Sequence, residues 1–274
     1  RRRYAIDLDM DSQVMVLNGT REGLFNGVVA LGQTGSKILI PNPFYQVYTV
    51  AAMAIGAQSM YLPARAESGF LPDLDALTPD DLNQTSVFFL CSPSNPQGVV
   101  ASKAYWTRLL TLAETYDFKI FADECYSEIY RTAPPPGALQ VAAQMGADPE
   151  RVVAFHSLSK RSNLPGLRSG FVASGFKNIS QIKQLRAYAG CPVAGPIQDV
   201  SAKVWSDEDH VVANRQLYCG KFEVADRIFA GIKSYNSPQA GFFLWLPVED
   251  DEAAALKLWT ETGLRVLPGS YLGQ

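Results

Sequence analysis

The sequence predicts an α/β fold in which helices flank a mainly parallel β-sheet. Short apolar runs alternate with longer amphipathic stretches along most of the chain, which is the order that successive βα units produce. Several of these runs are almost wholly apolar, as expected for strands that helices cover on both faces. The two observations together predict one large sheet of parallel type.

The predicted strands are Val14–Leu17, Lys37–Ile40, Ser59–Leu62, Val87–Leu90, Lys119–Ala122, Val152–Phe155 and Gly170–Ala173. The helices predicted between them are Glu22–Leu31, Tyr45–Ile55, Lys103–Tyr116 and Ile179–Ala189. Seven strands with intervening helices make a seven-stranded sheet the expected architecture.

The remainder of the chain has a different character. A long helix, with or without a kink, is predicted from Asp199 to about Ile232, because apolar residues recur there at helical spacing and helix breakers are few. The apolar run Gly241–Leu246 predicts a strand. A helix is predicted over Asp251–Thr262, with Gly263 as its C-cap.

This change predicts a domain boundary near residue 220. Residues 1–220 would form a large domain, and residues 221–274 would form part of a smaller α+β C-terminal domain. The second segment has about 50 residues, which we expect to be too few for a complete domain.

Composition excludes several classes of function. Charged residues make up 19% of the chain and the net charge is -3, so there is no nucleic-acid footprint beyond the basic cluster Arg1–Arg3. No apolar run reaches the ~18–20 residues that span a bilayer, so we expect no membrane partner. The four cysteines are widely spaced without a CxxC pair, which fits a reducing, cytoplasmic setting without a metal site.

Polar residues follow the predicted strands, and in parallel α/β sheets ligands bind at the carboxyl ends of strands. Asn18, Gly19, Thr20 and Arg21 follow the first strand and open a helix, whose free N–H groups suit a phosphate. An ordinary helix cap is the alternative interpretation of these residues.

Two further loops carry candidate side chains. Tyr45 follows Pro43 and Phe44, and its flat ring could stack on a flat cofactor; the alternative is a buried aromatic residue. Asn95 precedes Pro96, which favours an extended conformation that could direct the amide into a site. Its alternative is an ordinary turn.

Asp123 closes an apolar strand, where a carboxylate is costly unless it has a partner. A protonated heteroaromatic nitrogen would be such a partner, and Tyr126, three residues further on, could reach the same ligand. The alternative is an acid that caps the next helix.

Lys160 follows the sixth strand among the small hydroxyl residues Ser157 and Ser159. A lysine in a confined site can lose its proton and form a Schiff base. Arg168, eight residues later, could hold a phosphate through two hydrogen bonds. A surface lysine and a surface arginine are the alternatives. Together, the strand ends carry what pyridoxal 5'-phosphate (PLP) requires.

The chain resembles the class I/II aminotransferases of the fold-type I PLP enzymes. The resemblance covers essentially the whole chain and depends on five motifs: Asn18-Gly19-Thr20, Pro43-Phe44-Tyr45, Ser94-Asn95-Pro96, Asp123-Glu124-Cys125-Tyr126 and Ser157-Leu158-Ser159-Lys160, with Arg168 after the last. Within this family it is most similar to the N-succinyldiaminopimelate aminotransferases (DapC type) of bacterial lysine biosynthesis, in segments such as VLNGTREGLFNG and FHSLSKRSNLPGLRSGFVA. Ser94 and Gln97 depart from the commoner SPGNPTG pattern, but both flank Asn95 without replacing it.

The resemblance implies a role for each motif residue. Lys160 would bind the cofactor and move the substrate α-proton, while Asp123 would pair with the pyridine nitrogen. Asn95 and Tyr126 would bind the ring oxygen, and Tyr45 would stack on the ring. The residues implied to hold the phosphate are Gly19, Thr20, Ser157, Ser159 and Arg168.

The resemblance also implies a homodimer that transfers an amino group between glutamate and an oxo acid. Family members usually begin earlier and carry a C-terminal arginine for the α-carboxylate, so we expect this sequence to be a fragment. Arg21 and Arg161 both lie near the cofactor motifs and could meet a carboxylate of a doubly acidic substrate; surface charges are the alternative for each. A PLP-dependent C–S β-lyase and a catalytically inactive PLP-fold regulatory module remain alternative functions.

Overall fold

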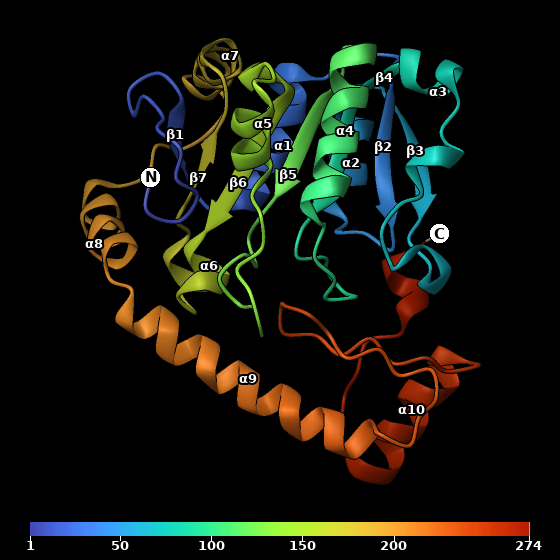
Figure 1. Ribbon diagram of the computed structural model, residues 1–274. Coiled ribbons are helices and arrows are strands. Elements are labelled where there is room, and N and C mark those ends of the chain that lie inside the picture. Colours follow the sequence, from blue (N-terminus) through green and yellow to red (C-terminus); the bar gives the residue numbers. More distant parts are fainter. Residues whose placement is uncertain (274) are drawn as a thin grey trace.

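A seven-stranded sheet with the strand order β1-β7-β6-β5-β4-β2-β3 organises the computed structural model, which describes residues 1–273 (Figure 1). Strand β7 runs antiparallel to both of its neighbours, and the other neighbouring pairs are parallel. The predicted α/β fold with a mainly parallel, seven-stranded sheet is therefore confirmed.

The strands are β1 Val14–Leu17, β2 Lys37–Asn42, β3 Gln58–Pro63, β4 Thr85–Cys91, β5 Lys119–Asp123, β6 Val152–Ser157 and β7 Gly170–Ala173. The helices are α1 Thr20–Leu31, α2 Val47–Ala54, α3 Pro79–Asn83, α4 Lys103–Tyr116, α5 Ala138–Met145, α6 Leu158–Arg161, α7 Phe176–Arg186, α8 Gly195–Ser206, α9 Asp209–Phe229 and α10 Asp251–Thr262.

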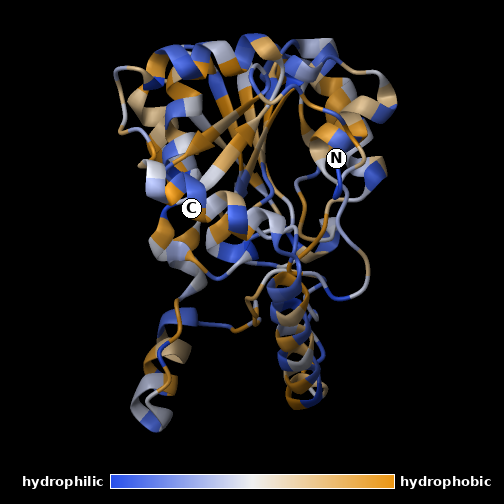
Figure 2. Ribbon diagram, turned by 90° about the vertical axis from the view of Figure 1, so that its left-hand side faces the viewer, coloured by the Kyte–Doolittle hydropathy of each residue, from blue (hydrophilic) through white to orange (hydrophobic). Residues whose placement is uncertain are grey.

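Helices cover both faces of the sheet, which explains why its central strands are so apolar. All seven residues of β4 are buried. Phe88 packs with Trp106 of α4 on one face, while Phe89 packs with Leu24 of α1 and Tyr48 of α2 on the other. Figure 2 shows these mostly hydrophobic strands between helices in which hydrophobic and hydrophilic residues alternate. Burial of the two faces supplies the hydrophobic stabilisation of the sheet.

The strand register brings the candidate residues to one edge of the sheet. Gly170 of β7 pairs with Leu17 on one side and with Ser157 on the other. Asp123 of β5 pairs with Cys91 of β4 and with Phe155 of β6. The loops that follow β1, β4, β5 and β6 therefore begin side by side.

The long helix predicted from Asp199 to Ile232 is wrong in one respect, because the structure divides it into α8 and α9. Asp207 lies between them and accepts a hydrogen bond from the Asp209 N–H at 2.9 Å, which starts the second helix. Arg161 binds the main-chain oxygens of Val204 and Asp207, at 3.0 Å and 3.2 Å. These bonds satisfy carbonyl groups that a continuous helix would have used internally.

The strand predicted over Gly241–Leu246 is also wrong. The N–H groups of Gln239 and Ala240 donate to Gly98 O at 2.8 Å and 3.0 Å, and the N–H of Gly241 donates to Ile129 O at 2.7 Å. This segment thus bonds to the loops after β4 and β5 and not to another strand. It places the ring of Phe242 against that of Tyr126, with centroids 5.3 Å apart.

The two-domain division remains a proposal. Residue 220 lies inside α9, which extends away from the sheet and runs beneath the carboxyl ends of the strands (Figure 1). In this proposal α9 connects a large domain, residues 1–220, with a partial small domain, residues 221–274. Between residues 1 and 273, no helix is both long and apolar enough to cross a membrane.

Helix α1 can approach the sheet closely because it carries glycine where it faces β1. A side chain at Gly23 would collide with Leu17, whereas a side chain at Gly220 of α9 would meet open space. We expect Gly23→Ala to lower the free energy of unfolding by about 1–3 kcal/mol through overpacking. Gly220→Ala, the matched control, should raise it by up to about 1 kcal/mol. Urea denaturation of both variants measures the difference, and equal effects would contradict this view of the α1 interface.

Candidate active site

The start of α1 forms a cradle that fits a small anion. Gly19 has a φ of 80°, and a side chain there would collide with the guanidinium group of Arg168. Arg168 donates to Asn18 O at 3.4 Å and to Pro165 O at 2.9 Å. A helix N-terminus beside an arginine, with no side chain between them, is suited to a phosphate group.

Two hydroxyl residues lie along the same edge. Thr20, the first residue of α1, is buried, and its Oγ1 lies 3.2 Å from Cys125 Sγ. Ser157, the last residue of β6, is buried and accepts a hydrogen bond from the Ser159 N–H at 3.0 Å. Since Ser157 and Leu17 both pair with Gly170, these groups belong to one neighbourhood.

Asp123 is a buried carboxylate at the end of β5, with 4% of its surface exposed. Its Oδ2 accepts from the Tyr48 hydroxyl at 2.9 Å and its Oδ1 accepts from the Cys125 N–H at 3.3 Å. Burial raises the pKa of Asp123, while hydrogen bonds from Cys125 and Tyr48 and the charge of Lys160 oppose the rise. A cationic ligand group would stabilise the ionised carboxylate in the same way.

Lys160 lies on α6, directly after β6. Its Nζ is 4.9 Å from the ring centroid of Phe242 and 5.8 Å from that of Tyr126. Tyr126 is buried, and burial raises the pKa of its hydroxyl, which therefore stays protonated at neutral pH. The lysine is thus held between two aromatic rings, close enough to Asp123 for its charge to act on the carboxylate.

Tyr45 and Asn95 reach the same neighbourhood through Tyr48. The Tyr45 ring meets the Tyr48 ring edge-on at 5.8 Å, and its hydroxyl accepts a hydrogen bond from Arg21 Nε at 2.6 Å. Asn95 lines a small cavity together with Tyr48 and Cys91. The structure therefore gathers the sequence-predicted residues around the carboxyl ends of β1, β4, β5 and β6.

The residues present fit PLP. The glycine–arginine cradle suits its phosphate, the buried carboxylate suits its pyridine nitrogen, and the aromatic and amide side chains suit its ring and ring oxygen. An amine lies within the same cluster. The fold and this set of donors define a PLP-dependent enzyme.

The model of the family "Aminotransferase class I and II" matches residues 1–274. The chain therefore belongs to the class I and II aminotransferases, which are PLP-dependent. Members of this family use amino acids and oxo acids as substrates.

Known relatives agree with this membership. An LL-diaminopimelate aminotransferase of Syntrophobacter fumaroxidans is 30% identical over 287 residues, an alignment that covers 100% of this chain and 71% of the relative. An aminotransferase structure from Neisseria meningitidis is 40% identical with a TM-score of 0.93, and the match covers 100% of this chain and 71% of that one. The structure of a probable N-succinyldiaminopimelate aminotransferase from Thermus thermophilus is 26% identical with a TM-score of 0.91, over 99% of this chain and 73% of that one.

Sequence reasoning did not identify Tyr48 and Phe242 as site residues. Tyr48 lies three residues after Tyr45, and this spacing was the available signal, since residues three apart share a helix face. Phe242 was assigned to a strand, so its contact with Lys160 could not be anticipated.

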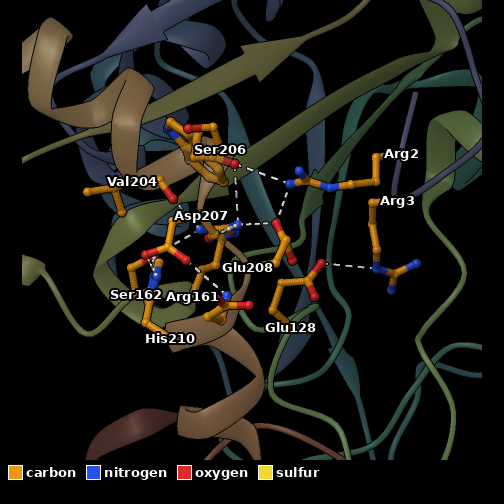
Figure 3. A network of polar contacts seen from close by, with 12 residues as sticks. Arg2, Arg3, Glu128, Arg161, Ser162, Val204, Ser206, Asp207, Glu208 and His210 are labelled. Carbon is orange, nitrogen blue, oxygen red and sulfur yellow. Dashed lines mark hydrogen bonds and ion pairs between the residues drawn. The ribbon is translucent and has the colours of Figure 1, made fainter.

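The structure places Arg161 in the interior of the protein. It is buried, with 5% of its surface exposed, and it contacts Glu208 and the main chain at the α8–α9 junction (Figure 3). Arg2 reaches the same Glu208 carboxylate. Arg161 is therefore a buried residue and not a surface charge. Arg21, in contrast, is exposed beside Tyr45.

Glu124, the residue directly after β5, is a second buried carboxyl group and has different partners from Asp123. Glu124 accepts a hydrogen bond from the Ala138 N–H at 2.7 Å, and its Oε2 lies 3.5 Å from His156 Nε2. Burial raises the pKa of Glu124 to about 7 and lowers the pKa of His156 to about 3. Both side chains line a cavity of about 880 Å³ with Tyr4 and Trp205, which includes none of the predicted cofactor residues.

The elevated pKa of Glu124 predicts how stability depends on pH. The folded protein keeps a proton on Glu124 that the unfolded chain releases between about pH 4.5 and 7, so this group lowers stability as the pH rises through that window. Glu124→Gln removes the penalty. We expect its free energy of unfolding, relative to wild type, to rise by up to about 3 kcal/mol from pH 4.5 to 7.

Denaturation at a series of pH values measures this difference. Glu223→Gln on the exposed face of α9 is the control, and its difference from wild type should not change with pH. A constant difference for Glu124→Gln would show that Glu124 ionises normally in the folded protein.

Proposed function

We propose that this chain carries the cofactor site of an aminotransferase of diaminopimelate metabolism, in which Lys160 is the catalytic amine. The observation that carries this proposal is the placement of Lys160 and Asp123 at the ends of the neighbouring strands β6 and β5. The buried carboxylate is fixed by two hydrogen bonds, and the amine lies close enough to influence its charge.

Each predicted residue has a proposed role that its position supports. Asp123 pairs with the pyridine nitrogen and keeps it protonated. Asn95 and Tyr126 donate hydrogen bonds to the ring oxygen, and Tyr45 covers the ring. The residues proposed to hold the phosphate are Gly19, Thr20, Ser157, Ser159 and Arg168.

When bound, PLP supplies a conjugated electron sink for the bond broken at the substrate α-carbon. Asp123 maintains this capacity by holding a negative charge where water is excluded. Lys160 accepts the α-proton and returns a proton to the product, and the rings of Tyr126 and Phe242 lie beside its amine. By holding the phosphate, the cradle of Gly19 and Arg168 would fix the orientation of the cofactor relative to Lys160, which an efficient proton transfer requires.

The proposed substrate pair is N-succinyl-LL-2,6-diaminopimelate and N-succinyl-2-amino-6-oxopimelate, with glutamate as the amino donor. The sequence segments around Gly19 and Lys160 support this choice. The second candidate is LL-diaminopimelate, which the relatives of that name favour. Both substrates carry a second acidic group, and exposed Arg21 beside Tyr45 is suitably placed to meet it.

We also propose that the protein acts in the cytoplasm as a homodimer with both active sites near the subunit interface. This part of the proposal rests on the family and on the placement of the site at an edge of the sheet. Size-exclusion chromatography with light scattering measures the assembly directly.

Lys160→Ala should abolish the visible absorbance of lysine-bound cofactor and lower kcat by at least about a hundredfold, the contribution expected of a general acid–base group. Lys203→Ala, on the exposed surface of α8, is the matched control and should leave both unchanged. Absorbance spectra and steady-state rates measure the effects. A Lys160→Ala protein that keeps its absorbance band and its activity would refute the assignment.

A substrate panel distinguishes the two diaminopimelate candidates. With glutamate as donor, we expect kcat/KM to be at least about tenfold higher for the N-succinylated oxo acid than for the unmodified one, a difference of about 1.4 kcal/mol. The reverse preference would assign the protein to LL-diaminopimelate. Release of pyruvate and ammonia from a cysteine conjugate without an oxo acid would instead indicate a β-lyase.

A further inference from the structure

Tyr48 is a buried tyrosine whose position is fixed by packing. It lies in the first turn of α2 with 2% of its surface exposed. Its ring stacks on Phe89 of β4, with centroids 4.2 Å apart and planes inclined by 14°, and meets Tyr45 edge-on. Contacts on two sides leave the ring one orientation, which directs its hydroxyl toward the end of β5.

The Tyr48 hydroxyl donates a hydrogen bond to Asp123 Oδ2 at 2.9 Å, while the Cys125 N–H donates to Oδ1 at 3.3 Å. Two donors on different oxygens determine the plane of the carboxylate. Burial raises the pKa of Tyr48 well above its ordinary value, so the hydroxyl remains a donor over the whole working range of pH. Hydrogen bonds to a charged group are about twice as strong as neutral ones.

Besides Tyr48, Cys125 supports the charge of Asp123 by hydrogen bonding through its thiol and its N–H. Cys91 of β4 and Cys125 are neutral, because burial raises the pKa of both thiols. Glu124 and Tyr126 follow Asp123 in the chain, and neither carries a positive charge. Among the groups that act on the Asp123 carboxylate, Lys160 provides the positive charge.

We propose that Tyr48 is a positioning residue that keeps Asp123 ionised and oriented toward the pyridine nitrogen of PLP. The proposal rests on the proposed role of Asp123. Without the Tyr48 hydroxyl, one carboxylate oxygen would lose its donor in a site that excludes water. Asp123 would then bind a proton at higher pH, and the protein would hold the cofactor less tightly on the acidic side of neutrality.

The test is Tyr48→Phe in the intact protein, with the dissociation constant of PLP measured against pH by absorbance and fluorescence. We expect the acidic limb of this profile to move up by about one pH unit, so that PLP binds about tenfold more weakly below it. Tyr105→Phe is the control, because the Tyr105 side chain is partly buried and its hydroxyl donates to Pro72 O at 2.8 Å and not to Asp123. Its profile should coincide with that of wild type.

Asp123→Asn separates the possible explanations. If Tyr48 acts through the charge of Asp123, adding Tyr48→Phe to Asp123→Asn should leave the PLP affinity unchanged at every pH. An equal loss in both backgrounds, or an unmoved acidic limb in Tyr48→Phe, would overturn the proposal for Tyr48. Normal PLP binding by Asp123→Asn would instead refute the proposed role of Asp123 itself.

Discussion

The need to keep one buried carboxylate charged constrains the architecture around the site. Asp123 lies at the end of an apolar strand, where an isolated charge would be too costly to persist. Three groups offset this cost: the Tyr48 hydroxyl of α2, the Cys125 N–H in the loop after β5, and the charge of Lys160 on α6. Each of these elements is in place because the parallel sheet brings their starting points to one edge.

Helix α6 performs two functions with adjacent residues. Lys160 is directed toward Tyr126 and Phe242, while Arg161 is buried at the junction between α8 and α9. The junction in turn determines where α9 leaves the sheet, and the chain after α9 supplies Phe242. The positions of the Lys160 amine and of the Phe242 ring beside it therefore both depend on the single turn of α6.

Much of the fold could be predicted because its signals are local. Helices α4 and α10 begin and end where the sequence indicated, and both have side-chain caps, Ser102 and Asp250. The predictions failed where distant residues decide the structure. Arg161 stabilises a break in a helical pattern, and Gly98 and Ile129 bind the segment predicted as a strand. The candidate residues were found from their places after strands, whereas the partner of Tyr48 depends on packing between α2 and β4.

The alternation of side chains along β5 also has an electrostatic consequence. Asp123 and Glu124 are consecutive acids, yet one faces the cofactor site and the other faces His156 and the start of α5. The two carboxyl groups therefore have different hydrogen-bond partners, although the charge of Asp123 still contributes to the raised pKa of Glu124. Inserting or deleting a single residue in β5 would turn each of these two acids toward the other's surroundings, away from its own hydrogen-bond partners. The length of this strand is consequently as much a part of the chemistry as the side chains at its end.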